Sequence, residues 1–160
     1  MMRNSTGAKG RYQTDGLFQP LNTSRSLTMA LLRAREALMS HFRPMLHSHD
    51  ITEQQWRVIR VLAEAGELET AEVAARASIL GPSLSRIVRT LEARKLISKR
   101  RDPEDGRRYF LSLTAGGNKL IEEVMPDSQS IYAELEKTLG KQRIEDLLVL
   151  LNDVSRLIKG

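Results

Sequence analysis

The sequence predicts a mainly helical fold with one small β-hairpin. Three helical patterns follow one another between residues 52 and 93, and two short extended runs come directly after them. Further long helical patterns flank this block on both sides. Three helices followed by a two-stranded hairpin is the element order of a winged helix-turn-helix. We therefore expect a winged helix-turn-helix combined with a helical dimerisation region.

Composition limits the class of protein. The 160 residues are 41% hydrophobic, which is enough for one domain with a core. The chain contains no cysteine, so disulfides and thiolate metal sites are excluded. No apolar run approaches the roughly 18 residues of a membrane span, and the first 20 residues do not resemble a signal peptide. We expect a cytoplasmic protein with no membrane partner.

The chain divides into a tail and one expected domain. Residues 1–23 have no helical or alternating apolar period and are interpreted as a flexible tail. Residues 24–160 are expected to form a single domain, with dimerisation helices at 24–48 and 115–160 around a winged helix-turn-helix at 50–113. The dimerisation helices carry more apolar surface than one wing domain can cover, which favours a homodimer.

The first helices are predicted from their caps. Ser26 is a plausible N-cap of the first, whose last turn Pro44 should disturb, so that residues 47–50 form the connection. Thr52 and Gln55 have the spacing of a capping box for the second helix, which should end at Gly66. A short third helix is expected from about residue 70.

The fourth helix is predicted to open at Gly81, as N-cap, with Pro82 at the first helical position. On a helical wheel its residues separate into an apolar side, expected in the core, and a slim basic side. The apolar side contains Leu80, Leu84, Ile87, Val88 and Leu91, and the basic side contains Pro82, Ser85, Arg86, Arg89 and Ala93.

A hairpin and two more helices complete the prediction. The runs Ile97–Arg101 and Tyr109–Leu113 are joined by turn-forming residues, which indicates a β-hairpin. Thr114 is the expected N-cap of a fifth helix with a bend at Pro126. A sixth helix follows, with apolar residues from 144 to 158.

Positive charge is concentrated in one segment. Residues 81–110 hold nine Arg or Lys against four acidic residues, an excess equal to the net charge of +5 for the whole chain. A basic patch on a winged helix-turn-helix favours double-stranded DNA as the partner. The candidate DNA-binding residues are Pro82, Ser83, Ser85, Arg86, Arg89, Arg101, Asp105, Arg107 and Arg108.

These candidates have different expected roles. Ser85 is short enough for a close approach to the major groove, where Arg86 and Arg89 can bond guanine edges or phosphates. Ser83 can bond a phosphate near the helix start. Arg107, at the hairpin tip, is expected in the minor groove. The alternative reading of the fourth helix is an ordinary solvated amphipathic helix.

Asp105 is expected to position a neighbouring arginine through a charge-assisted hydrogen bond, because a carboxylate is repelled by phosphates. The alternative is a simple turn residue.

Three motifs resemble the MarR family of bacterial regulators, and the similarity covers roughly residues 27–158. They are Leu80–Arg86 at the fourth helix, Leu91–Ile97 before the hairpin, and Asp105–Thr114, which is similar to the family's Asp-x-Arg wing motif ending in Leu-Thr. Within the family, Ser26–Glu36 and Ile51–Arg57 resemble regulators of homoprotocatechuate and 4-hydroxyphenylacetate degradation.

This resemblance implies a homodimer on a near-palindromic operator that represses an aromatic-compound catabolic operon. A small phenolic or aromatic acid effector would release it. Such an effector should bind where the dimer helices meet the DNA-binding part. The candidate effector-binding residues are Arg33, Arg35, His41, Arg43 and Trp56, although helix-surface arginines are mostly solvated and a lone Trp is usually core.

Several alternatives remain open. An enzyme is disfavoured because the sequence has no cysteine nucleophile and no phosphate-binding glycine-rich loop. His47 and His49 lack a third ligand nearby, so no metal and no cofactor is expected. A MarR-type regulator of another response, such as stress or efflux, and a protein that coats DNA without sequence preference are the remaining readings.

Overall fold

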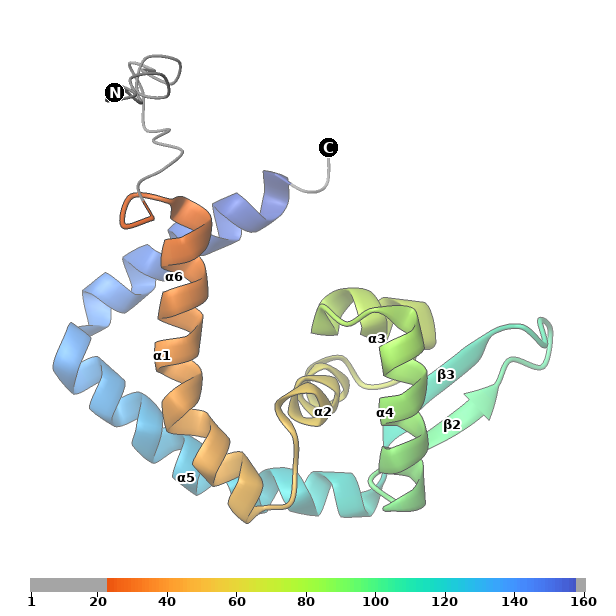
Figure 1. Ribbon diagram of the computed structural model, residues 1–160. Helices are drawn as coiled ribbons and strands as arrows, with labels where there is room; N and C mark the ends of the chain where they lie inside the picture. Colours follow the sequence, from red (N-terminus) through yellow and green to blue (C-terminus); the bar gives the residue numbers. More distant parts are fainter. Residues whose placement is uncertain (1–22, 158–160) are drawn as a thin grey trace, which may run out of the picture. The chain divides into compact units, whose positions relative to one another are not determined.

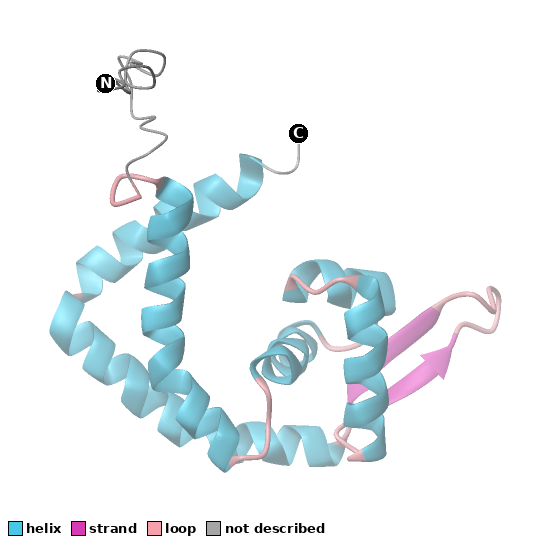
Figure 2. Cartoon of the chain, in the orientation of Figure 1, coloured by secondary structure: helices cyan, strands magenta, loops and turns pink. Residues whose placement is uncertain are grey.

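The computed structural model describes residues 23–157, in which helices predominate around a small sheet (Figures 1 and 2). The elements are α1 (Leu27–Ser48), α2 (Glu53–Ala65), β1 (Leu68–Glu69), α3 (Thr70–Ala77), α4 (Gly81–Ala93), β2 (Ile97–Arg101), β3 (Tyr109–Leu113), α5 (Ala115–Leu139) and α6 (Lys141–Arg156). The predicted fold class is confirmed. Residues 1–22 of the predicted tail lie outside the described part of the chain.

The chain separates into two compact units, with the boundary between His41 and Phe42 inside α1. In the first unit, Ser26 caps α1 as expected, because its Oγ accepts a hydrogen bond from the Met29 amide at 3.4 Å. Arg33 reaches back over the same helix end, where its Nη2 donates to the Thr23 carbonyl at 3.2 Å. Local contacts thus fix the start of α1.

The expected connection at residues 47–50 is wrong in its first half, because α1 continues past Pro44 to Ser48. A proline inside a helix removes one backbone hydrogen bond. Met45 and Leu46 lie directly after it and are buried, so their burial offsets that loss. The chain then turns at Asp50, which adopts a left-handed φ of 59°.

The caps of α2 agree with the prediction. Thr52 Oγ1 accepts from the Gln55 amide at 3.2 Å, and the Gln55 side chain accepts from the Thr52 amide at 3.0 Å, which is a complete capping box. Gly66 ends the helix with a φ of 78°, a conformation that favours glycine.

The hairpin is part of a three-stranded antiparallel sheet with the order β1-β3-β2. Strand β1 has only two residues, too few to show a periodic pattern, so the sequence did not reveal it. Leu68 pairs with Leu111, and Lys99 pairs with Leu111 from the other side. Leu111 is fully buried and anchors the sheet to the core.

The core of the second unit is built by the helices around this sheet. Leu84, Ile87, Val88 and Leu91 form the buried row of α4, as predicted. The largest fully buried side chains are Leu46, Ile59, Leu62, Leu84, Leu91, Leu111, Val58, Val73 and Val124.

Leu80 was expected in that core and is instead 79% exposed. The N-cap of α4 is Leu80 and not Gly81, so its backbone is extended, with φ −67° and ψ 143°. A helical wheel assumes helical backbone at every position. Because Leu80 lies outside the helix, its side chain does not follow the row that begins at Leu84.

Glycine brings the start of α5 against the turn that joins α4 to β2. Thr114 caps α5 as predicted, accepting from the Gly117 amide at 3.1 Å, and its hydroxyl donates to the Lys95 carbonyl at 2.6 Å. A Cβ at Gly117 would lie only 2.2 Å from the Leu96 carbonyl oxygen. This junction therefore requires glycine and fixes α4 and the hairpin relative to α5.

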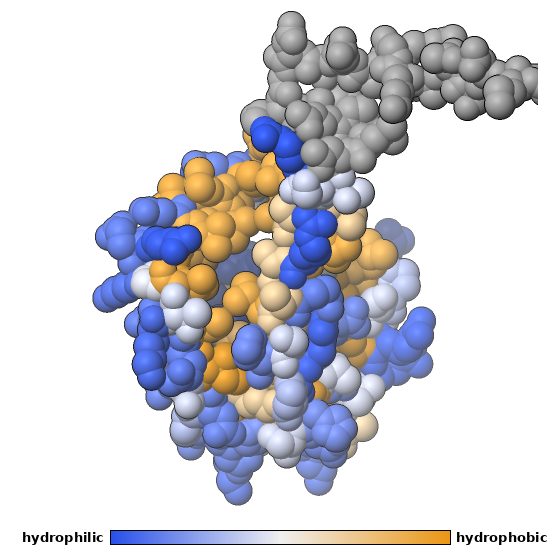
Figure 3. Space-filling view, turned by 60° about the vertical axis from the view of Figure 1, so that its left-hand side comes forward, coloured by the Kyte–Doolittle hydropathy of each residue, from blue (hydrophilic) through white to orange (hydrophobic). Residues whose placement is uncertain are grey.

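The helix α5 runs through Pro126 to Leu139, and its ribbon changes direction along its length (Figure 1). The last helix, α6, has no buried residue. Its exposed apolar side chains include Leu147, Leu148, Val149 and Leu150, which are 45% to 62% exposed. The space-filling view, turned so that the left-hand side of Figure 1 comes forward, shows hydrophobic residues at the surface (Figure 3).

Between residues 23 and 157, no helix is long and apolar enough to cross a membrane.

Candidate nucleic-acid interface

The outward face of α4 carries two arginines with no partner among residues 23–157. Arg86 and Arg89 are exposed, and the Ser85 hydroxyl between the helix start and these arginines is occupied by the Gly81 carbonyl at 3.3 Å. A planar guanidinium can form two parallel hydrogen bonds to a guanine edge or to a phosphate. This face therefore presents two uncommitted cations on a rigid helix.

The start of α4 also has free hydrogen-bonding capacity. Its N-cap makes no side-chain hydrogen bond, and no acidic residue lies in the first turn. The amides of Gly81 and Ser83 have no acceptor inside the helix, as in any first turn, and Pro82 has no amide hydrogen. Pro82 is exposed and Ser83 is half-buried. This end can accept an anion such as a phosphate.

Two arginines of the hairpin are held by one acid in β1 and one acid directly before it. Arg100 contacts Glu67 at 2.6 Å from Nη2 and 3.3 Å from Nε, and Arg108 Nη2 donates to Glu69 Oε2 at 2.8 Å. Arg108 also lies 3.7 Å from Asp102 Oδ2. These contacts tie β2 and the end of the hairpin loop to β1 and to the residue before it.

The ion pairs shift the ionisation of the acids. The hydrogen bond from Arg100 lowers the pKa of Glu67, and the hydrogen bond from Arg108 lowers the pKa of Glu69. The pKa of Asp102 is lowered chiefly by the backbone amide of Glu104. All three carboxylates therefore stay charged at neutral pH and keep their arginines paired.

Aromatic rings add to the same network. The Arg100 guanidinium carbon lies 4.8 Å from the centre of the Phe110 ring, and the Arg108 carbon lies 5.6 Å from it. Lys99 Nζ lies 4.2 Å over the Tyr109 ring. Cations over aromatic faces are attracted by the ring quadrupole. The strands thus hold most of their own basic side chains in place.

The hairpin tip is braced by hydrogen bonds between side chains and the main chain. Asp105 Oδ1 accepts from the Arg107 amide at 3.0 Å, and the Arg101 Nε donates to the Gly106 carbonyl at 2.8 Å. Asp105 therefore positions Arg107 through its backbone, in a turn, and not by bonding its guanidinium. The Arg107 side chain is exposed and has no partner among residues 23–157.

The free positive charge is thus smaller than the sequence indicated. Glu67 and Glu69 lie outside the segment whose charges were counted, and they pair with two of its arginines. Pairing of residues some 30 to 40 positions apart cannot be read from local charge. The side chains of Arg86, Arg89 and Arg107 remain uncommitted.

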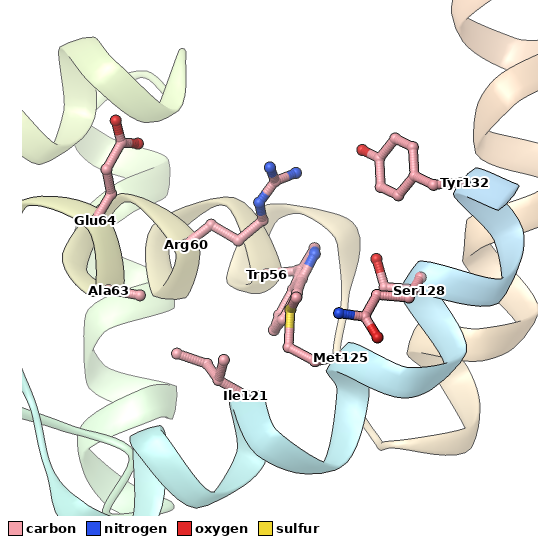
Figure 4. A pocket seen from close by; sticks show the side chains of 9 residues that line it. Trp56, Arg60, Ala63, Glu64, Ile121, Met125, Ser128 and Tyr132 are labelled. Carbon is pink, nitrogen blue, oxygen red and sulfur yellow. The ribbon is translucent and has the colours of Figure 1, made fainter. Parts of the chain in front are cut away.

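A separate pocket of about 360 Å³ lies between α2 and α5 (Figure 4). Trp56, a predicted effector-binding residue, lines it and is buried. Arg60 comes from the next turn of α2, and Ser128 and Tyr132 come from α5. Ile121 and Met125 add apolar surface. The pocket combines apolar walls with one guanidinium, two hydroxyls, the carboxylate of Glu64 and the amide of Gln129.

Three of the pocket residues, Arg60, Ser128 and Tyr132, were not predicted from the sequence. Two features of the sequence could have indicated the first two. Arg60 follows Trp56 by four residues and so shares its helix face. Ser128 interrupts the apolar spacing between Val124 and Ile131 on α5.

The other predicted effector residues do not line this pocket. Arg43 Nη2 lies 3.7 Å from Glu53 Oε2. In the first unit, Arg33 bonds Thr23, Arg35 pairs with its neighbour Glu36 at 3.0 Å, and His41 is exposed.

His49 contacts an acidic residue of α5. Its Nε2 lies 3.0 Å from Asp127 Oδ2. No group of three or more metal-ligating side chains occurs within residues 23–157.

The sequence and the fold match those of known proteins. The MarR family profile matches residues 49–108. The HTH-type transcriptional regulator FarR of Neisseria gonorrhoeae is 41% identical over 132 residues, which are 82% of this chain and 90% of that protein. The homoprotocatechuate degradative operon repressor of Escherichia coli is 38% identical over 128 residues, which are 80% of this chain and 86% of that protein.

Among solved structures, NadR in complex with 4-hydroxyphenylacetate has a TM-score of 0.74 and 43% identity, covering 82% of this chain and 93% of that one. The resemblance inferred from the three motifs and from the first helix is confirmed. The chain belongs to the MarR family of DNA-binding transcriptional regulators and is not an enzyme.

Proposed function

We propose that the protein is a homodimeric repressor of an aromatic-compound catabolic operon and that a small phenolic or aromatic acid releases it from its operator. The observation that carries this proposal is the pair of uncommitted cationic elements: Arg86 and Arg89 on α4, and Arg107 at the wing tip. Two such elements on one domain match the two grooves of a duplex.

On the DNA, α4 enters the major groove. Ser85 permits close approach, while Arg86 and Arg89 bond base edges or phosphates. Pro82 and Ser83 lie against the backbone, where the start of the helix favours a phosphate. These roles explain why the exposed side of α4 is slim near its start and basic further along.

The wing supplies one cation to the minor groove, the guanidinium of Arg107. Asp105, Arg101 and Arg108 act beside it, chiefly by holding the loop and strands that present it. A braced loop loses less conformational entropy on binding than a mobile one.

The dimer is supported by the apolar surface of α6. Four consecutive residues, Leu147 to Leu150, are exposed there. Exposed apolar runs of this kind are typical of surfaces that a second protein covers. A two-fold dimer places its two copies of α4 about one helical turn of DNA apart, roughly 34 Å, which requires a near-palindromic operator.

The effector pocket is proposed to be the one that contains Trp56. An aromatic ring can pack against Trp56, while its carboxylate pairs with Arg60. The hydroxyl of Tyr132 and that of Ser128 can bond a phenolic group. The relatives support this ligand class, because one carries homoprotocatechuate in its name and another was solved with 4-hydroxyphenylacetate.

Release follows if the ligand binds better to the conformation that does not fit DNA. Since α2 belongs to the winged helix-turn-helix and α5 leads towards α6, a ligand between them can change how the reading helices are spaced.

A titration tests this function. The protein is placed on a duplex from its own promoter region, and 4-hydroxyphenylacetate, homoprotocatechuate and a hydroxycinnamate are added while anisotropy reports bound DNA. At least one acid should lower the affinity, and hexanoate, which has the charge but no ring, should not.

Arg60→Ala is the matched variant. It should keep the affinity for DNA and lose the response to the acid, because Arg60 lies in the pocket and not on α4. If no aromatic acid changes the affinity, the proposal of aromatic catabolism fails while operator binding stands.

A further inference from the structure

Leu80 is a large apolar side chain placed at the start of the reading helix with nothing packed over it. It is 79% exposed, whereas Leu84, four residues later, is 1% exposed. Single exposed leucines are common on protein surfaces and alone indicate nothing. The position of this one, as the N-cap directly before the first turn of α4, is what calls for an explanation.

The residue after it has an equally unusual setting. A Cβ built on Gly81 meets no atom within 4 Å, and Gly81 is not among the residues with positive φ. The free protein therefore has no steric need for glycine here. Glycine in a helix costs about 0.5 to 1 kcal/mol relative to alanine. A missing side chain on an open surface leaves clearance for something that approaches the backbone closely.

The chemistry of the major groove identifies what an exposed leucine can contact there. The groove presents hydrogen-bonding atoms at every base pair, and its one apolar group is the C5-methyl of thymine. The first residues of a recognition helix are those that reach the base edges. Leu80 has no polar atom in its side chain, so a methyl group is the matching contact.

We propose that Leu80 is a specificity-determining residue that packs against a thymine methyl in each half-site, with Gly81 providing the clearance. The inference rests on the proposed entry of α4 into the major groove. Leu80 would thus make a base-specific contact in addition to those of Arg86 and Arg89, and this contact is apolar.

Removing only the methyl tests this contact. A preferred operator is first selected from random duplexes, and then each thymine is replaced by deoxyuridine, which keeps every hydrogen-bonding group. Wild-type affinity should fall by about fourfold per half-site at one symmetric thymine pair, the equivalent of about 0.8 kcal/mol for one buried methyl-sized group.

The Leu80→Ala variant should bind the thymine operator more weakly and show no further loss on the deoxyuridine operator. Leu80→Met keeps an apolar side chain and should stay sensitive to the methyl. Both variants should unfold at the wild-type temperature, because the side chain is exposed. Gly81→Ala should also fold normally but bind the operator less tightly.

The outcomes separate the two proposals. If no duplex is preferred over random DNA, operator binding itself is wrong. A second outcome would overturn the methyl contact alone. In it, Arg86→Ala weakens operator binding, but replacing thymine by deoxyuridine lowers the affinity of Leu80→Ala as much as that of the wild type.

Discussion

The helix α4 and the hairpin of β2 and β3 are both rich in arginine, but they use it differently. On α4, Arg86 and Arg89 have no partner among residues 23–157. On the hairpin, Arg100 and Arg108 are paired with acids and Arg101 bonds the loop, so that Arg107 alone stays uncommitted there. The number of basic residues in a segment therefore does not give the positive charge that is available for DNA, because some of these residues are already paired with acids.

The difference has a physical cause. A helix satisfies its backbone hydrogen bonds internally, so the outward side chains of α4 are not needed for its stability. A two-stranded hairpin is marginally stable alone. Its strands are supported by the third strand, β1, and by the ion pairs of Glu69 in that strand and of Glu67 directly before it.

Gly117→Ala should have the largest effect on stability, because Gly117 lies at the junction that holds α4 and the hairpin against α5. A Cβ there would lie 2.2 Å from the Leu96 carbonyl oxygen, at the junction of α4 and β2. Overpacking of this kind costs about 1 to 3 kcal/mol of stability, sometimes more. Urea unfolding measures the loss. The same substitution at Gly81, where an added Cβ meets no atom within 4 Å, is the control and should not lower stability; an equal loss of stability in both variants would refute the tight junction.

Arg86→Ala and Arg89→Ala test the uncommitted helix arginines. Each should cost on the order of 1 to 3 kcal/mol of operator affinity if it reads a base. Stability should not change, since neither side chain has a partner among residues 23–157. Anisotropy with the operator gives the affinity and thermal unfolding gives the control. Unaltered affinity would return both residues to an ordinary solvated face.

Arg107→Ala and Arg100→Ala compare a free and a paired wing arginine. Loss of Arg107 should weaken binding and make the salt dependence shallower by roughly one unit per lost phosphate contact. If Arg107 enters the minor groove, the preference for A/T beside the half-site is lost as well. Arg100→Ala should change the salt dependence less, because Glu67 already neutralises that side chain. Equal effects of the two substitutions would contradict the division between them.

The smallest expected effect is on pH dependence. Because the pKa of Glu69 is lowered below its usual 4.5, its stabilising contribution is present at neutral pH. As the pH falls from 7 through the lowered pKa, Glu69 is protonated and this contribution to stability is lost. Wild type should therefore be slightly more stable than Glu69→Gln at pH 7, and the two should converge in acid. A difference that grows in acid would have the wrong sign.

The sequence revealed the features that depend on local patterns. The capping box at Thr52, the cap at Thr114 and the buried row from Leu84 to Leu91 are set by residues a few positions apart. The helical wheel failed at Leu80 because that residue is not in the helix, and the end of α1 was placed too early because packing of Met45 and Leu46 offsets Pro44.

Long-range pairing was beyond local patterns. The strand β1 has two residues, and the acids in it and directly before it, Glu69 and Glu67, meet arginines more than thirty positions later. The pocket likewise joins Arg60 to Tyr132, on helices separated by the whole hairpin. Such features follow from tertiary structure and not from spacing.

The central claim is that α4 and the wing read a specific operator, and competition binding at one fixed salt concentration tests it most directly. A labelled duplex from the protein's own promoter region is competed with the unlabelled duplex and with random DNA. The account predicts a preference of at least about a thousandfold for the promoter sequence. Equal competition by random duplex would contradict it and favour a protein that coats DNA without sequence preference.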